Sequence, residues 1–289
     1  MLDLYVNVKN SLKGLIQALR ISISNANNFN TPGYKYTFAS FTTVYSEAMS
    51  SGTRTQNPMH VGSAMTMGST STDFSQGNLS IGTSMDTAIV GEGFFILSQN
   101  AFEFAKGADK VYTRAGRFQT DSSNKYITDS FGRKVYGFKV DANGNAINNE
   151  LVPLETNGEQ DLGFLEGGIL ASNFSLAKND TAVQAKPMYR LALTTFQNKQ
   201  GLVPASGGAY TPTVSSGEQL SVNVSEGAIG SNASGSYGNI VGETLESANV
   251  DIAKVALDMN LLNRGFSAVQ AVIDDIGKIV NQLISKIIG

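Results

Sequence analysis

The residues that could carry chemistry are few, and they stand apart from one another in the sequence. The chain has no cysteine and a single histidine, His60, in a stretch rich in serine, glycine and methionine. A metal centre needs several ligands, and a zinc site is usually built from cysteine and histidine together. A Ser-His-Asp triad would depend on His60 alone. Met59, Met65 and Met67 are better explained as packing residues, so we predict no metal site and no catalysis by cysteine or histidine.

Pairs of acidic residues are the second possible source of chemistry. Asp73 with Asp86, or Glu155 with Glu159, could act as general acid and base if the fold brought them together. Catalytic carboxyl pairs lie at roughly 5–10 Å, and nothing in the spacing of these residues predicts such a separation. We interpret them as solvated surface acids. The sequence therefore predicts no catalytic residue, no small-molecule substrate and no enzyme activity.

Two loops resemble ligand-binding motifs but lack an essential part. No helical pattern follows Gly91-Glu92-Gly93, whereas a dinucleotide fingerprint needs a glycine turn that opens a helix. We expect a tight turn between two strands there. Residues 141–145 contain one carboxylate, that of Asp141, and no glutamate follows where a calcium loop needs one. The Asn143-Gly144 pair predicts a hairpin turn instead, so no cofactor is expected.

The composition argues against functions on nucleic acids or in membranes. Twenty-one basic and 24 acidic residues give a net charge of −3 without a basic cluster, and a phosphate-binding surface needs clustered Lys and Arg. Charged residues make up 16% of the chain, below the usual quarter or so. Such a surface suits a subunit covered by neighbours, or a Gly- and Ser-rich β protein. Charged residues at 3, 9, 13 and 20 interrupt the apolar N-terminus, so we expect export without a cleaved signal peptide.

The dominant pattern is a long amphipathic helix at the C-terminus. Apolar residues recur there in alternating steps of three and four, the heptad pattern of a helix that packs against another helix. The helix would be about 54 Å long, capped by Ser247 or Asn249 with Asp251 in its first turn. Its other faces are too polar for stable membrane insertion. The apolar face consists of Ile252, Val255, Met259, Leu262, Phe266, Val269, Ile273, Ile276, Val280, Leu283 and Ile287.

Residues 1–27 carry a second amphipathic pattern, which makes them the natural partner of the C-terminal helix. The asparagines within 25–28 should loosen the end of this helix. Pro32 then keeps Thr31 out of the α region, and Gly33 allows a positive φ. The apolar face of the helix consists of Leu4, Val8, Leu12, Leu15, Leu19, Ile23 and Ala26.

The middle of the chain has the patterns of β structure. Residues 46–71 show no steady period, and we interpret them as an extended, loosely structured arm; 225–239 reads as a Gly- and Ser-rich linker. Between them, short alternating runs bounded by glycine predict antiparallel strands. The expected fold class is α+β, with N- and C-terminal helices paired as a coiled-coil-like unit and a central all-β domain inserted between them. The expected domains are a helical axial core (1–45 and 240–289), an extended arm (46–71) and a β-rich outer domain (72–239).

Three motifs resemble the bacterial flagellar rod and hook proteins. Residues 24–35, Ser-Asn-Ala-Asn-Asn-Phe-Asn-Thr-Pro-Gly-Tyr-Lys, are similar to the N-terminal signature of that family, with one extra residue between Ala26 and Asn30. Residues 112–118, Tyr-Thr-Arg-Ala-Gly-Arg-Phe, match its Tyr-Thr-Arg-x-Gly-x-Phe at every fixed position. Residues 242–251 resemble its Gly-x-Leu-Glu-x-Ser-Asn-Val-Asp segment, with Ser and Ala rearranged. The motifs follow the family's order at both ends and in the middle of the chain.

The resemblance implies a structural subunit that polymerises with itself and with other flagellar axial proteins, in the rod or hook of the flagellum. Such a subunit transmits motor torque and leaves the cell through the flagellar type III apparatus. The short interval between Phe138 and Tyr189 favours a rod protein, because hook proteins carry a further β domain there; residues 264–266 are closer to the hook form. The alternative is a soluble β-rich binding or adhesin module on a helical hairpin. The expected assembly interface comprises Leu12, Leu15, Leu19, Asn30, Pro32, Gly33, Ile252, Val255, Met259, Leu262, Phe266, Val269 and Ile273.

Overall fold

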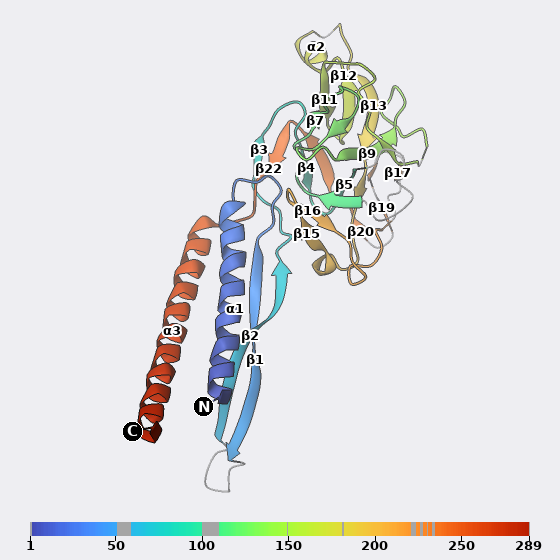
Figure 1. Cartoon of the computed structure of the whole chain (residues 1–289). Coiled ribbons are helices and arrows are strands. Elements are labelled where there is room, and N and C mark those ends of the chain that lie inside the picture. Colours follow the sequence, from blue (N-terminus) through green and yellow to red (C-terminus); the bar gives the residue numbers. More distant parts are fainter. Residues whose placement is uncertain are drawn as a thin grey trace. The chain divides into compact units, whose positions relative to one another are not determined.

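The computed structural model divides the chain into two compact units, each described by itself (Figure 1). The helical unit comprises Met1–Asn28, Tyr36–Asp73 and Val250–Gly289, and the β unit comprises Phe29–Lys35 and Phe74–Asn249. The structure describes residues 2–50, 59–99, 110–148, 150–180, 182–220, 224–225, 228–229, 231–232 and 235–288. Both units are therefore assembled from segments that are distant in the sequence.

Two terminal helices lie in the helical unit, as the periodicity predicts. Helix α1 runs over Leu2–Asn27 and helix α3 over Ile252–Ile288. The helices contact each other, since a Cβ atom at Gly265 of α3 would lie 3.5 Å from Leu15 Cδ2 of α1. With a β-rich part between them, the helices confirm the α+β class.

The N-terminus of α3 is capped by a different residue from the expected ones. Asp251 Oδ1 accepts hydrogen bonds from two N–H groups of the first helical turn, at 2.9 and 3.3 Å, which is the role of an N-cap side chain. Ser247 and Asn249 instead belong to the β unit. The Ser247 N–H donates to Asn78 O at 2.8 Å, and Asn249 Nδ2 donates to Ser75 O at 3.1 Å. The prediction of a cap at Ser247 or Asn249 was wrong because both residues are engaged before the helix begins.

A long β-hairpin occupies most of the region where we expected a loosely structured arm. Strands β1 (Thr37–Ser50) and β2 (Met59–Thr72) pair antiparallel, with Thr37 opposite Thr72 and Ser50 opposite Met59. The pairing register shifts at four places along the hairpin. Each bulge reverses the face to which the following residues point. The sequence therefore shows no period of two, although the strands are paired.

The hairpin is fastened to α1 by polar side chains of the helix. The Met65 N–H of β2 donates to Ser11 Oγ at 3.2 Å. The Asn25 amide binds the backbone of Thr37 twice: Nδ2 donates to Thr37 O at 2.6 Å, and Oδ1 accepts from the Thr37 N–H at 3.0 Å. Asn25 thus acts like a neighbouring strand at the start of β1. Asn25 therefore holds the hairpin to α1. We had expected it to loosen the end of the helix instead.

The described part of the β unit consists of many short strands, one short α-helix and a 3-10 helix at Lys199–Gly201. In chain order the strands and the α-helix are β3 (Leu79–Ile81), β4 (Thr87–Val90), β5 (Phe94–Ser98), β6 (Lys110–Thr113), β7 (Gln119–Thr120), β8 (Ile127–Thr128), β9 (Lys134–Lys139), β10 (Val152–Pro153), β11 (Leu162–Leu165), β12 (Ile169–Ser172), α2 (Phe174–Asn179), β13 (Lys186–Leu191), β14 (Leu193–Thr194), β15 (Val203–Ala205), β16 (Ala209–Thr211), β17 (Val224–Ser225), β18 (Ala228–Ile229), β19 (Ser231–Asn232), β20 (Gly235–Ser236), β21 (Asn239–Gly242) and β22 (Thr244–Glu246). The expected linker 225–239 lies partly outside the described residues, and its described part includes the short pairs β17–β18 and β19–β20.

Most of these strands form one antiparallel sheet. Its main path is β11-β12-β13-β9-β5-β6-β16-β15, with β10, β14, β7 and β8 joined beside it. Two further pairs, β21 with β4 and β22 with β3, join the end of the β segment to its beginning. Residues 240–249 therefore belong to the β unit, whereas we had expected the helical core to begin at residue 240.

Strand β5 is buried on both faces. Phe95 and Leu97 belong to one apolar cluster, and Phe94 and Ile96 belong to a second. Since alternate residues of a strand point to opposite faces, the unbroken apolar run of β5 reflects a core on each side.

No described helix is apolar enough over a sufficient length to cross a membrane.

Candidate structural site and assembly surface

The three sequence motifs meet at one buried ion cluster in the β unit. Glu246 of β22 has no exposed surface and accepts hydrogen bonds from Lys35 Nζ at 2.6 Å and from Arg114 Nε at 3.0 Å. A further bond comes from the Gly77 N–H at 2.9 Å, and Lys35 Nζ also donates to Ser75 O at 2.6 Å. We call Lys35, Arg114 and Glu246 the motif junction. Each of its residues comes from a different motif.

Arg114 also closes the turn between β4 and β5. Its NH1 group donates to the carbonyls of Gly91 at 2.6 Å and Gly93 at 3.1 Å, and NH2 donates to Ile89 O at 3.1 Å. Both glycines have positive φ, 108° and 140°, and this conformation points their carbonyl groups at one guanidinium. The predicted tight turn at Gly91–Gly93 is confirmed, and its carbonyl groups bind the guanidinium of Arg114.

The turn after Pro32 lies against the same junction. Gly33 has φ +66°, as predicted, and its N–H donates to Glu246 O at 2.8 Å. A Cβ atom at Gly33 would lie 2.4 Å from Ala115 N and 2.5 Å from Arg114 C. Both the conformation and the space therefore require glycine. Of the other predicted turn residues, Asn30 is exposed and Pro32 is half-buried.

The electrostatics of the motif junction make it a structural site. One carboxylate faces two cations, and all three side chains are at least 96% buried. Charges so deeply buried are tolerated only when they are paired and hydrogen-bonded, and removal of one partner leaves an uncompensated charge. The local sequence gave no sign of this pairing, since Glu246 is 211 residues from Lys35 and 132 from Arg114. The only signal was the position of each residue inside a family motif.

The predicted apolar face of α3 is only partly covered in the helical unit. Val255 and Ile276 are buried, whereas Ile252, Val280 and Leu283 are exposed. The remaining predicted interface residues of α3 are half-buried: Met259, Leu262, Phe266, Val269 and Ile273. On α1, Leu15 is buried, and Leu12 and Leu19 are half-buried.

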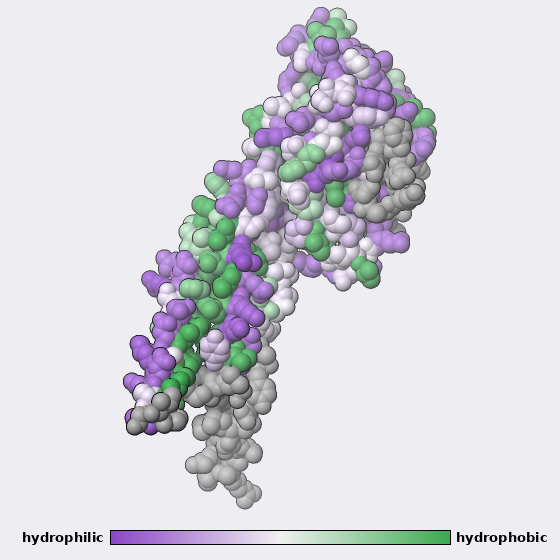
Figure 2. Space-filling view, viewed as in Figure 1, coloured by the Kyte–Doolittle hydropathy of each residue, from purple (hydrophilic) through white to green (hydrophobic). Residues whose placement is uncertain are grey.

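A second apolar stripe on α3 was not predicted. Leu257 and Leu261 are 69% and 68% exposed, and Val272 and Ile279 are also exposed. These residues lie one or more helical turns apart, so they share one side of α3. On the face seen in Figure 2, green side chains gather along the helices. Searching the sequence for a second period of three and four would have found this stripe.

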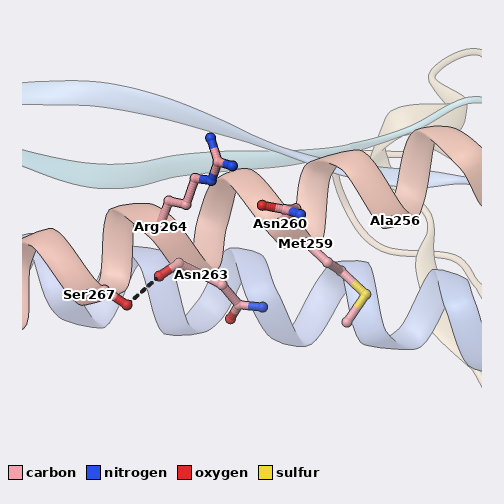
Figure 3. Close-up of a pocket in the computed structure, with 6 residues that line it drawn as sticks. All are labelled: Ala256, Met259, Asn260, Asn263, Arg264 and Ser267. Atoms are coloured by element: carbon pink, nitrogen blue, oxygen red, sulfur yellow. Dashed lines mark hydrogen bonds between the residues drawn. The ribbon is translucent and has the colours of Figure 1, made fainter.

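The hollows of the helical unit are open surface features. The first is lined by Ala256, Met259, Asn260, Asn263, Arg264 and Ser267, all from α3, so one helix alone forms it (Figure 3). The second is a groove of about 370 Å³ lined by α1, β1 and α3, with Phe38 and Leu261 on its walls. At this groove Tyr36 Oη donates to Asp258 Oδ2 at 2.9 Å, and Lys254 Nζ lies 4.7 Å from the Tyr36 ring centre. Burial, with a smaller effect of Asp258, raises the pKa of Tyr36 to about 12.

The residues considered for chemistry do not form a metal site in the part of the chain that the structure describes. No group of three or more acidic, histidine or cysteine side chains comes together among those residues. Asp86 is buried, so its interpretation as a solvated surface acid was wrong; Oδ2 accepts hydrogen bonds from the N–H and the hydroxyl of Thr83. Glu155 and Glu159 line one polar hollow that also contains lysines. The side chain of His60 lies outside the described residues.

The uncovered apolar surface of the helices is typical of a protein that associates with other protein chains. Two curated relatives match almost the whole chain. The flagellar basal-body rod protein FlgG of Agrobacterium fabrum is 26% identical over 276 residues (91% of this chain and 92% of the relative). FlgG of Bacillus subtilis is 23% identical over 282 residues, or 95% of each chain.

Hook proteins match a smaller part. The flagellar hook protein FlgE of Helicobacter mustelae is 34% identical over 137 residues, which is 45% of this chain but 29% of the hook protein. No protein-family model matches the chain. The chain is thus a homologue of flagellar rod and hook proteins, and the resemblance inferred from the three motifs is confirmed. The binding-module alternative is not favoured by these relatives.

Proposed function

We propose that this chain is a structural subunit of the flagellar axial structure, and specifically of the rod. Its homologues are rod and hook structural proteins. The rod proteins match it end to end, whereas it spans less than a third of the hook protein's length. The choice of rod over hook rests on this difference and on the short interval between β9 and β13, where a further domain would have to stand.

The observation that carries the proposal is the uncovered apolar surface of α3. Eight large apolar residues of this helix are at least 38% exposed: Ile252, Leu257, Leu261, Val272, Ile279, Val280, Leu283 and Ile284. Monomeric proteins rarely leave so much contiguous apolar surface in water, and such patches mark protein–protein interfaces. A polymer in which α3 packs on neighbouring copies would cover it.

In the proposed polymer, α1 and α3 pair as a coiled-coil-like unit and the remaining faces of both helices contact other copies. The heptad spacing of α3 supports this arrangement. The assembly interface would include the half-buried seam of α3 together with Leu12, Leu15 and Leu19 of α1. Asn30, Pro32 and Gly33 would contribute by fixing the turn after α1. The helical unit (1–28, 36–73 and 250–289) would supply the axial core, and the β unit (29–35 and 74–249) the outer domain.

The proposed role needs neither a cofactor nor a substrate. The subunit would associate with itself and with other flagellar axial proteins, and would transmit motor torque through the assembled shaft. The uncovered helices support this role because each can contact more than one neighbour.

Two substitutions on α3 with matched exposure test the proposal. Leu261 is 68% exposed and Lys278 has a side chain that is 73% exposed. Leu261→Ser should raise the protein concentration needed for polymer formation, measured by light scattering and electron microscopy. Lys278→Ser should change it little, because solvated surface positions usually matter by less than about 0.5 kcal/mol. Melting of the β unit should be unchanged in both. Equal polymerisation of the two variants would contradict the proposed interface.

A further inference from the structure

Arg190 is a buried cation without a partner among the residues that the structure describes. It lies on β13 and is 9% exposed, and its Nε atom has neither accessible surface nor a hydrogen bond. No ion pair joins it to any residue that the structure describes. The other deeply buried cations of the β unit differ in this respect. Lys35 and Arg114 share Glu246, and Arg133 Nε donates to Asp129 Oδ2 at 2.6 Å.

The fold holds Arg190 in place, with its guanidinium beside the turn between β11 and β12. Its backbone is fixed between two strands, opposite Ile169 of β12 and Phe138 of β9. The NH2 atom lies 3.4 Å from the position that a Cβ of Gly167 would occupy. Gly167 has φ +77°, a conformation that favours glycine. Because residue 167 is glycine, the turn between β11 and β12 places no side chain beside the NH2 atom.

Burial of an unpaired charge is unfavourable, so an acceptor supplied from outside would stabilise it. Desolvation lowers the pKa of Arg190, but a guanidinium stays protonated in proteins. Loss of hydration without a replacement bond costs free energy for every unsatisfied N–H group. An anion that reached the guanidinium would restore these bonds in surroundings where water competes weakly.

We propose that Arg190 is a binding site for a carboxylate group. The planar fork of a guanidinium accepts a carboxylate through two parallel hydrogen bonds, which a point charge such as lysine cannot reproduce. The carboxylate would be either a free small carboxylate or an acidic side chain of a second copy of this chain. The second source rests on the proposed function, whereas the first does not. The main internal competitor is Glu166, an exposed residue next to Gly167 in the turn.

A titration of the full-length monomer with acetate tests the site. Two-dimensional NMR of chain labelled with ¹⁵N-arginine follows each Nε–H group, and chloride at equal ionic strength is the control. The Arg190 signal should shift saturably with acetate but not with chloride, and the signal of exposed Arg264 should not saturate. Acetate should also raise the melting temperature of the β unit, because a ligand that binds only the folded state stabilises it.

Three variants make the outcome decisive. Arg190→Met should fold and lose the acetate-dependent rise in melting temperature, and Arg190→Lys should bind acetate about tenfold more weakly. Glu166→Gln should leave acetate binding unchanged. The proposal is overturned if wild type shows no saturable shift, if Arg190→Met keeps the response, or if only Glu166→Gln binds acetate, since Glu166 would then fill the site.

Polymerisation distinguishes the two sources. If a second copy supplies the carboxylate, acetate at constant ionic strength should inhibit polymer formation by wild type but not by Arg190→Met. Inhibition of wild type alone supports the second copy, and acetate binding without inhibition supports a free carboxylate. Because the titration uses monomer, failure to polymerise would count against the proposed function and leave the carboxylate site standing.

Discussion

At the scale of single residues, Glu246 is the anion that compensates the two buried cations of the motif junction. Its carboxylate is the shared partner of Lys35 and Arg114, and all three side chains are buried. Glu246→Gln keeps the shape but removes the charge, which leaves two cations without compensation. Breaking a buried ion pair in this way costs about 3–5 kcal/mol. We expect a loss of this size in the free energy of unfolding of the β unit, measured by urea denaturation with tyrosine fluorescence.

The control for this prediction is the neighbouring Glu243. It pairs with Lys178 at 2.6 Å, but its side chain is 39% exposed and that of Lys178 is 60% exposed. Exposed ion pairs contribute at most about 1 kcal/mol, so Glu243→Gln should have a small effect. If the two glutamine variants were equally stable, burial of the motif junction would not be what makes it important.

Gly33 offers a second residue-scale prediction. Gly33→Ala and Gly158→Ala both place a side chain at positive φ, 66° and 82°, which costs about 1–2 kcal/mol. Only at Gly33 would the new Cβ meet backbone, at 2.4 Å, because nothing lies within 4 Å of the corresponding position at Gly158. Gly33→Ala should lose a further ~1–3 kcal/mol from overpacking. Equal urea midpoints for the two variants would show that the turn at Gly33 can open without cost.

Sequence reasoning predicted the turn at Gly33 but not the ion pairs of Glu246. The physical reason is that the turn is local, whereas the ion pairs join residues that are far apart in the sequence. The turn after Pro32 can be predicted locally, because glycine is the residue that adopts a positive φ without steric cost. The partners of Glu246 are set by how β22 reaches β3 and the chain around Lys35, over more than a hundred residues. No local preference encodes such a contact.

At the scale of elements, the helices were predictable and the hairpin was not. The apolar residues of α1 and α3 recur in steps of three and four, so the helical period is visible along both sequences. The β1–β2 hairpin interrupts its own alternation at four register shifts. Its attachment depends on Ser11 and Asn25 of α1, which look like ordinary polar helix residues in the sequence.

The contact between Tyr36, which directly precedes β1, and Asp258 of α3 should weaken at alkaline pH. The pKa of Tyr36 is raised from 10.0 to about 12, first by desolvation and then by Asp258. A raised pKa means that the folded state holds the proton more tightly. Its stabilising effect is therefore complete below pH 10 and is lost as the pH rises towards 12. The stability of the helical unit, measured from unfolding followed by circular dichroism, should fall more steeply over this pH range in wild type than in Tyr36→Phe.

Tyr5 of α1 provides the matched control for the alkaline experiment. It is 45% exposed, in contrast to Tyr36, which is 8% exposed. Tyr5→Phe should keep the wild-type slope between pH 10 and 12. A slope that changed equally in both variants, or in neither, would show that the Tyr36–Asp258 contact does not contribute to the pH dependence of the helical unit.

At the scale of the whole molecule, the two units differ in how completely they bury their apolar residues. The β unit has two closed clusters, one on each face of β5. The helical unit leaves Leu257, Leu261 and other large residues of α3 uncovered. Long helices in water are marginal without packing. We therefore expect α1 and α3 to be far less protected than the β unit in the isolated subunit, and to become ordered on assembly.

Hydrogen exchange, compared between dilute monomer and assembled polymer, tests this account most directly. Mass spectrometry of peptides from α3 should show rapid exchange in the monomer and strong protection in the polymer. Peptides from β5 and β9 should be protected equally in both. Strong protection across residues 1–27 and 252–287 in the monomer, unchanged on assembly, would contradict the claim that these helices form the interface between subunits.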